Sequence, residues 1–196
     1  MTLLPVQCRC GTVKGTVRRP RRFTRCVCYC KDCRAFARFL GRTGEIMDEK
    51  GGTDVVQIVP ADITFSQGRE ALACLRLTRR GMLRWYASCC NTPIGNTVGN
   101  TKISFVGLIH TCLQIGGASL DQLFGPVDAR VNTGSALAPV EPERLKALWA
   151  TLRFMTLLPR ARFGSRPPNA FLSADGAPLA APRVLTASEL AGLRSA

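Results

Sequence analysis

The sequence CVCYCKDC, residues 26–33, places four cysteines within eight residues. A buried cysteine acts in packing only as a small hydrophobic side chain, so packing does not require this density. Thiols at C-x-C and C-x-x-C spacing can instead point at one common centre, where a soft metal ion such as Zn²⁺ binds. We therefore expect Cys28, Cys30 and Cys33 to form a three-thiolate zinc site with an open fourth position. Cys26 is either a spare thiol or the fourth ligand that closes this site.

Two further cysteine pairs lie on either side of this stretch. Cys8 and Cys10 precede a glycine, and Cys89 and Cys90 lie in a second predicted turn. A structural zinc needs four ligands, which distant turns often supply. Cys8, Cys10 and Cys90 are candidates for three of them, with Cys89 or Cys26 as the fourth. A two-Cys two-His finger is excluded because the chain has a single histidine. One larger thiolate cluster and purely structural metal are the alternatives.

Composition predicts a globular chain with reduced thiols and an anionic partner. The 196 residues include 10 cysteines and carry a formal net charge of +14. The first residues lack the basic region of a signal peptide, so we expect a cytoplasmic protein in which metal sites are favoured over disulfides. The longest apolar run, residues 103–120, contains polar residues and glycines and does not resemble a membrane span. Nucleic acid, an anionic membrane surface and glutathione all fit the charge, as does a merely solvated surface.

Short segments of high strand propensity, separated by turn signals, predict a mainly β, antiparallel body. The expected strands cover residues 12–17, two segments around Pro60 within 55–66, then 71–77, 83–86 and 101–108.

One short helix is expected over residues 32–41, directly after the cysteine stretch. Ala35, Phe36 and Phe39 give it an apolar face, and Gly41 gives it a stop. The C-x-x-C end would then lie at the helix N-terminus, where the helix dipole favours a thiolate.

The pattern changes after Pro139, which divides a zinc-binding β domain at residues 1–138 from a helix and Pro/Ala-rich tail at 139–196. Residues 141–158 have helical periodicity, and five apolar side chains share one face. Two interpretations are open: docking on the β body, or a basic amphipathic helix resting on a membrane or partner. The tail from residue 166 is weakly patterned and is expected to be partly disordered, with a last short helix at 185–193. The apolar residues of the first helix are Leu145, Leu148, Trp149, Leu152 and Met155.

The order of these motifs resembles the glutathione-dependent formaldehyde-activating enzyme family, also called the centromere protein V-like domain family. Residues 8–11 match its C-x-C-G element and residues 28–34 its C-x-C-x-x-C-R block. Phe65 and Gly68 match a strand and a glycine turn, and Tyr86 followed by residues 90–93 matches its closing aromatic and C-x-x-C-G-T-P element. The resemblance covers residues 8 to about 108.

Two positions depart from the pattern and indicate a diverged branch. The first cysteine of the family's last pair falls at Ala87, which cannot bind metal, and Cys89 is the candidate replacement. The family glycine is Asn91, which tolerates a left-handed backbone.

The resemblance implies a β-rich, tent-like zinc fold and the joining of glutathione to formaldehyde, a carbon–sulfur lyase-type activity. Zinc held by Cys28, Cys30 and Cys33 would take the substrate thiol at its open position and lower the pKa of that thiol. From charge alone, Arg34 or the arginines near residue 20 are candidates to hold glutathione carboxylates. The alternative is a non-catalytic zinc module whose basic surface binds nucleic acid or protein.

Overall fold

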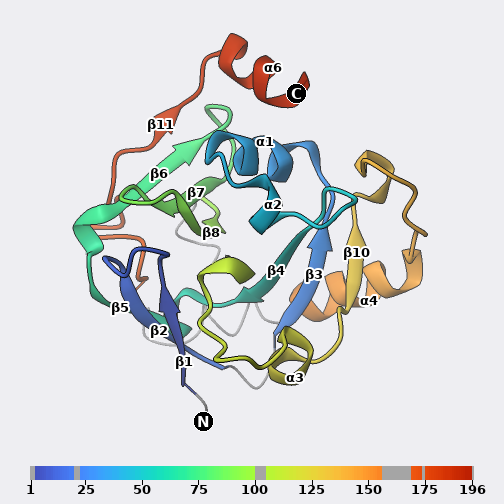
Figure 1. Ribbon diagram of the computed structural model, residues 1–196, viewed down its shortest axis with the longest axis horizontal. Helices are drawn as coiled ribbons and strands as arrows, with labels where there is room; N and C mark the ends of the chain where they lie inside the picture. Colours follow the sequence, from blue (N-terminus) through green and yellow to red (C-terminus); the bar gives the residue numbers. More distant parts are fainter. Residues whose placement is uncertain (1–2, 20–22, 100–104, 156–168, 174, 196) are drawn as a thin grey trace.

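Two β-sheets form the body of the protein (Figure 1). The computed structural model describes residues 3–19, 23–99, 105–155, 169–173 and 175–195. The smaller sheet has the order β1-β2-β5 and the larger one β10-β3-β4-β9-β8-β7-β6-β11. The strands are β1 (Leu3–Gln7), β2 (Lys14–Arg18), β3 (Thr24–Cys28), β4 (Thr53–Ile58), β5 (Ile63–Gln67), β6 (Leu72–Arg76), β7 (Leu83–Ala87), β8 (Thr92–Thr97), β9 (Val106–Ile109), β10 (Ala129–Val131) and β11 (Arg183–Val184). The predicted mainly β class is confirmed.

The larger sheet is mixed, which corrects the expectation of a purely antiparallel body. Its six inner strands, β3, β4, β9, β8, β7 and β6, pair antiparallel, whereas the edge strands β10 and β11 run parallel to β3 and β6. A parallel neighbour needs a long connection rather than a tight hairpin. Both edge strands come from the C-terminal part of the chain, after long excursions that local turn signals do not reveal.

Sequence patterns located β2, β4, β5, β6 and β7 within a few residues, but they missed β1, β3 and β8 and the short edge strands β10 and β11. Strand β8 is buried at every position although its sequence, TPIGNT, contains a proline, a glycine and an asparagine. These residues are typical of turns, and only a place in the middle of the sheet makes them a strand. The strand expected at 101–108 is described from Val106 on, and residues 100–104 lie outside the described residues.

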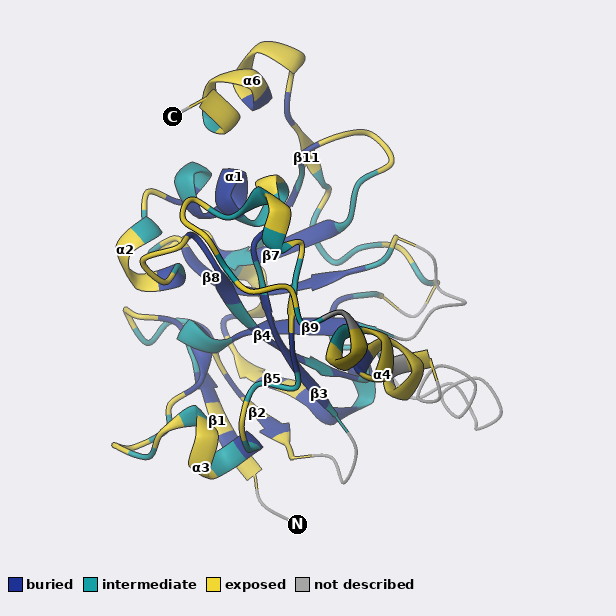
Figure 2. Ribbon diagram, turned by 90° about the vertical axis from the view of Figure 1, so that its right-hand side faces the viewer, coloured by how far each residue is buried: buried dark blue, intermediate teal, exposed yellow. Residues whose placement is uncertain are grey.

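Strands β8 and β9 are buried along their whole length (Figure 2). The core between the sheets is centred on Trp85 of β7, which is fully buried and donates from Nε1 to the Thr97 hydroxyl at 2.9 Å. Phe171 is also fully buried and lies 5.2 Å from Trp85 and 5.5 Å from Phe65, measured between ring centroids. Phe171 belongs to the segment predicted as a partly disordered tail. Phe171 therefore packs into the body, and the domain boundary expected at Pro139 stays a prediction.

An ion-pair network fixes strand β3. Arg25, expected in a basic surface stretch, is buried and pairs with Asp54 of β4 at 2.7 Å and with Asp121 at 2.5 Å. Its backbone N–H donates to the Asp128 carboxylate at 2.8 Å. Arg18 in the same stretch pairs with Asp62 at 3.0 Å. These arginines are thus engaged within the protein, while residues 20–22 lie outside the described residues.

The helices cover the edges of the body and are α1 (Lys31–Phe39), α2 (Thr43–Ile46), α3 (Leu120–Phe124), α4 (Arg144–Met155) and α6 (Ala187–Ser195). Helix α1 confirms the expected helix at 32–41, and Gly41 just beyond its end has a left-handed φ of 66°. Helix α6 confirms the expected last helix and contacts α1, with Arg194 paired to Asp32 at 2.5 Å. None of the described helices is long and apolar enough to cross a bilayer.

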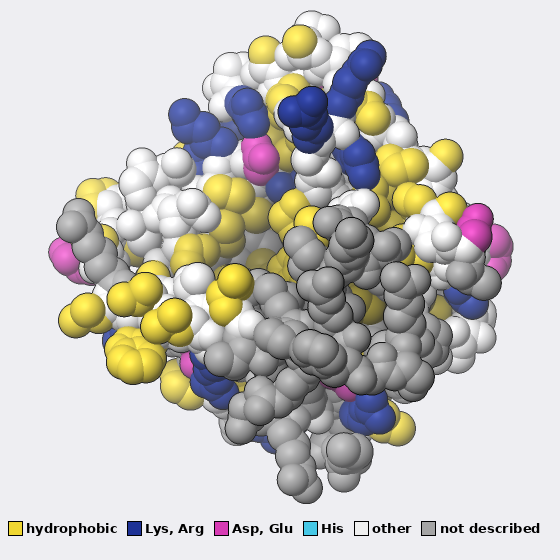
Figure 3. All heavy atoms as spheres, turned by 180° about the vertical axis from the view of Figure 1, so that it is seen from behind, with side chains coloured by type: hydrophobic (Ala, Val, Ile, Leu, Met, Phe, Trp, Pro, Cys, Tyr) yellow, Lys and Arg dark blue, Asp and Glu magenta, His cyan; other side chains and the backbone are white. Residues whose placement is uncertain are grey.

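Helix α4 confirms the predicted helix, but its apolar face does not dock on the β body. Trp149 is 70% exposed and Leu145 is 75% exposed, and the remaining members of that face are exposed as well (Figure 3). Ala150, on the opposite side of the helix, is the buried residue. Among the described side chains of α4, Ala150 thus faces the body and the five apolar ones of the predicted face point outward, which the periodicity alone could not distinguish.

Candidate metal centres

Seven cysteines gather into two separate groups. The four-thiol group consists of Cys8, Cys10, Cys89 and Cys90, and the three-thiol group consists of Cys28, Cys30 and Cys33. Within each group, all Sγ atoms lie within 4.8 Å of one another. Both groups could hold a metal ion.

The spacing of the four-thiol group fits a tetrahedral centre. The Sγ atom of Cys10 lies 3.5 Å from that of Cys8 and 3.3 Å from that of Cys89. Cys8 and Cys89 are 3.8 Å apart, and Cys89 and Cys90 are 3.9 Å apart. A zinc ion with bonds of about 2.3 Å to four sulfurs would separate them by about 3.8 Å. Cys89 therefore lies where the four-thiol group needs its remaining ligand, while Ala87 is buried in β7.

Two facing turns build the four-thiol group. Cys8 and Cys10 lie between β1 and β2, where the Cys8 N–H donates to Val13 O at 3.0 Å and Gly11 adopts a φ of 80°. Cys89 and Cys90 lie between β7 and β8, followed by Asn91 with a φ of 55°. Asn91 thus adopts the left-handed backbone that it was expected to tolerate, at the position where the formaldehyde-activating enzyme pattern has a glycine.

Nearby donors favour the thiolate form of Cys10 in the four-thiol group, whereas burial raises the pKa of Cys8 and raises the pKa of Cys89 to about 12. The Val13 N–H donates to the Cys8 Sγ at 3.2 Å. The Cys10 Sγ lies 3.2 Å from the Thr12 hydroxyl, and this hydroxyl, followed by the Thr12 backbone N–H, lowers the pKa of Cys10 to about 6. A low thiol pKa suits metal binding, because the thiolate is the form that binds.

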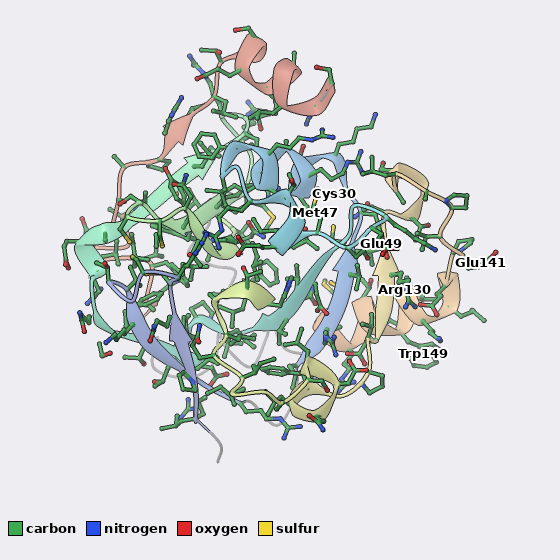
Figure 4. All side chains as sticks on the ribbon, viewed as in Figure 1. Cys30, Met47, Glu49, Arg130, Glu141 and Trp149 are labelled. Atoms are coloured by element: carbon green, nitrogen blue, oxygen red, sulfur yellow. The ribbon has the colours of Figure 1, made fainter. Side chains whose placement is uncertain are left out.

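The three-thiol group forms where β3 passes into α1 (Figure 4). Cys28 is the last residue of β3, Cys30 is the N-cap of α1, and Cys33 lies in the first turn of that helix. The Cys33 N–H donates to the Cys30 Sγ at 3.3 Å, as in a side-chain cap. All three cysteines are partly accessible to solvent.

Hydrogen bonds favour a thiolate at Cys30 of this second group, whereas contacts with the neighbouring thiols raise the pKa of Cys28 and of Cys33. Contacts with the Cys28 and Cys33 thiols lower the pKa of Cys30 most, and the Cys33 N–H contributes. Asn132, just after β10, donates from Nδ2 to the Cys28 Sγ at 3.4 Å. Asn132 is a functional candidate that the sequence did not reveal, because only the parallel pairing of β10 with β3 brings it there.

Cys26 does not join the three-thiol group. It lies two residues before Cys28 on β3, is buried, and receives a long contact of 3.8 Å from the Gln57 amide. Burial raises the pKa of Cys26 to about 12, which disfavours the thiolate. In the described part of the chain, no cysteine, histidine, aspartate or glutamate completes the three-thiol group as a fourth member. The geometry therefore matches the open alternative.

Arg34, expected to bind a carboxylate, is buried beside the three-thiol group. Its Nη1 donates to Tyr29 O at 3.0 Å and also to Ser135 O. These contacts tie α1 to the strand and loop around it, so the binding of glutathione by Arg34 stays a prediction without structural support. Lys31, one residue after Cys30, is exposed and takes part in none of the ion pairs between described residues.

The sequence pattern of a known family matches residues 1–159, which contain all seven grouped cysteines and helix α4. The chain belongs to the DUF6151 family, a family of unknown function. No curated protein matches the chain. The DUF6151 match ends before Phe171 and α6, so the C-terminal residues that pack onto the body lie outside the matched region.

Proposed function

We propose that the protein is a zinc-dependent carbon–sulfur lyase-like enzyme that joins a low-molecular-weight thiol, such as glutathione, to a small aldehyde such as formaldehyde. The observation that carries the proposal is the three-thiol group, which is partly exposed and has no fourth ligand among the described residues. Catalytic zinc sites keep one position for water or substrate, whereas structural sites are closed. The resemblance in motif order to the formaldehyde-activating enzymes supports the same reaction.

The residues present fit a zinc ion at this position. Three sulfurs converge within 4.8 Å, and N–H donors from Cys33 and Asn132 point at two of them. Cys28, Cys30 and Cys33 would hold the ion, which supplies a Lewis acid that lowers the pKa of a substrate thiol.

The chain's own residues would prepare the site for that chemistry. Helix α1 directs its positive N-terminal end at the group through Cys30 and Cys33, which favours negative charge there. Asn132 holds the Cys28 sulfur in place through its amide. Exposed Lys31 is placed to attract a carboxylate of glutathione, a role that Arg34 cannot fill while it binds backbone carbonyls.

The overall reaction forms one bond and moves one proton. The thiol sulfur attacks the carbonyl carbon of formaldehyde, and the proton lost by the thiol ends on the carbonyl oxygen. The product with glutathione is S-hydroxymethylglutathione. The reverse reaction breaks the same carbon–sulfur bond.

NMR exchange spectroscopy on a mixture of glutathione and formaldehyde tests this proposal. The zinc-loaded wild-type chain should exchange the free and thiol-bound aldehyde faster than the uncatalysed mixture. Cys30→Ser should abolish the enhancement, and Cys112→Ser, at a buried cysteine outside both groups, is the matched control that keeps it. An exchange rate equal to the uncatalysed rate would exclude this substrate pair.

The alternative, a non-catalytic zinc module that binds nucleic acid, predicts a different result. Such a protein would bind random DNA with an affinity that falls steeply as salt rises, because counterions compete with its basic side chains. It would show no exchange enhancement.

A further inference from the structure

Arg84 on β7 is a buried cation without an acidic partner in the described part of the chain. Its exposed fraction is 5%, and none of the ion pairs found between described residues includes it. Its Nη1 donates to the Asn96 side-chain oxygen at 3.2 Å, and its Cζ lies 5.5 Å from the centroid of the Phe36 ring. Both partners are neutral.

A buried guanidinium such as that of Arg84 is stabilised by a negative charge nearby. Arginine keeps its proton in proteins, so Arg84 cannot escape the cost of burial by becoming neutral. One amide oxygen and one ring face offset only part of the desolvation of a full charge.

Arg84 packs against the helix that carries two of the three thiols, so the three-thiol group is the candidate source of that negative charge. Phe36 lies three residues after Cys33 on α1, so these two side chains share one side of the helix. Arg84 packs over that ring from β7.

We propose that Arg84 is the counter-charge of a metal centre held by Cys28, Cys30 and Cys33, and thereby a positioning residue for anionic sulfur ligands. Three thiolates and a divalent ion sum to a charge of about −1, which one guanidinium balances. A substrate thiolate at the open position adds a further negative charge, which Arg84 would also stabilise. This inference rests on the proposed function, because it requires the metal to bind at the three-thiol group.

Zinc titration against a competing chelator, with the full-length chain, tests the inference. Arg84→Met should lower the zinc affinity of the three-thiol group by about tenfold to a hundredfold, the range typical of residues that support metal ligands. Arg84→Lys keeps the charge and should retain most of that affinity. The four-thiol group in the same molecules should be unaffected.

Arg183 provides a matched control. It too lies over a phenylalanine of α1, with its Cζ 5.4 Å from the Phe39 ring, but its side chain is 57% exposed and paired with Glu189. Arg183→Met removes a comparable stacking contact without removing a buried charge. Its zinc affinity should equal that of the wild type.

Thermal unfolding with and without zinc is a second measurement, which separates the effect of the Arg84 charge from that of its side-chain shape. Without metal, the buried charge is unbalanced in the wild type, so metal-free Arg84→Met should melt at or above metal-free wild type. With zinc bound, the order should reverse. If Arg84→Met does not fold, Arg84→Gln against Arg84→Lys supplies the same comparison of neutral and charged side chains.

The inference is overturned if neutral and charged variants bind zinc equally, or if Arg183→Met weakens binding as much as Arg84→Met. Wild type that binds no zinc at the three-thiol group overturns the proposed function, and this inference with it. Wild type that binds zinc there and is insensitive to Arg84 overturns the inference alone.

Discussion

Both cysteine groups offer thiol ligands to a metal ion, but the four-thiol group would surround the ion, whereas the three-thiol group would leave one position open. In the four-thiol group, two turns that are about 80 residues apart in sequence face each other, and Cys10 and Cys89 come within 3.3 Å. The three-thiol group is local, built within six residues where β3 passes into α1, and among the described residues it has no fourth member. The first arrangement closes a coordination sphere and joins distant parts of the fold. The second leaves a position for a ligand. Under the proposed function, the first group therefore serves stability and the second serves chemistry.

The two groups are connected through α1. The helix begins at Cys30, and the carbonyl of Leu40 at its other end accepts a hydrogen bond from Asn91 at 3.4 Å. Arg42, just beyond, donates to Cys90 O at 3.2 Å. The closed group therefore supports the end of the helix that presents the open group.

The largest expected effect is a difference in unfolding free energy between a variant of the four-thiol group and a variant of the three-thiol group. Cys10→Ser should lower the free energy of unfolding of the zinc-loaded chain by about 4 kcal/mol or more, since an ion present at about 1,000 times its Kd contributes that amount. Cys30→Ser should lower it far less and leave the circular dichroism spectrum unchanged. Urea unfolding of both variants measures the difference. Equal losses would mean that the two groups play the same structural role.

A loss of unfolding free energy of similar size is expected from a substitution at Phe171, which belongs to neither cysteine group. Phe171→Ala removes a fully buried ring against Trp85 and Phe65, which should cost about 3–5 kcal/mol in unfolding free energy. Zinc content under native conditions should stay at the wild-type value, because Phe171 supplies no ligand to either cysteine group. Urea unfolding and elemental analysis measure the two quantities. A loss below about 1 kcal/mol would show that the C-terminal residues do not complete the core.

Removing one hydrogen-bond donor should affect the open group alone. Asn132→Gly keeps the left-handed backbone, with a φ of 58°, and removes the amide that donates to Cys28. The zinc affinity of the three-thiol group should fall about tenfold. Asn91→Gly is the control, because Asn91 has the same backbone conformation and donates to a carbonyl instead of a sulfur. Chelator competition that ranks the two variants equally would contradict the assigned role of Asn132.

A smaller effect is expected from pH in the metal-free chain. Thr12 lowers the pKa of Cys10 to about 6, below the ordinary value of 9.0, so the unfolded chain binds more protons than the folded chain between these values. The stability from Cys10 is therefore present above about pH 9 and is lost as pH falls through about 6. Unfolding measured across this window should show a stronger rise with pH for wild type than for Cys10→Ser. Parallel curves would contradict the lowered pKa.

The smallest effect on unfolding free energy is expected from a substitution on α4, which carries none of the grouped cysteines. Leu148 is 55% exposed on the outward apolar face, so Leu148→Glu should change the free energy of unfolding by no more than about 0.5 kcal/mol. Thermal melts of the variant and wild type measure the change. A loss of about 2 kcal/mol or more would mean that this face is covered in solution.

Much of the fold and of the candidate site could be predicted from local sequence. The C-x-C-x-x-C spacing located the three-thiol group, and propensity located α1 and most inner strands, because these depend on neighbouring residues. Features that depend on distant parts of the chain were not predicted. Examples are the turn-forming residues in β8, the parallel edge strand β10 and the burial of Phe171.

The same limit applies to the site residues. Asn132 lies over 100 positions from Cys28, and Arg84 more than 50 positions from Cys30, so spacing could not associate them with the thiols. Arg34 was chosen because it is charged and adjacent to Cys33, but its guanidinium serves backbone carbonyls. Charge in a sequence does not tell whether a side chain faces solvent or the interior.

Metal content per chain tests the division between a closed and an open centre most directly. Wild-type protein purified with zinc should contain two ions per chain by elemental analysis, and Cys30→Ser should contain one ion and remain folded. A wild-type chain with a single ion, or a Cys30→Ser variant that unfolds, would contradict the assignment of the three-thiol group as an open metal centre.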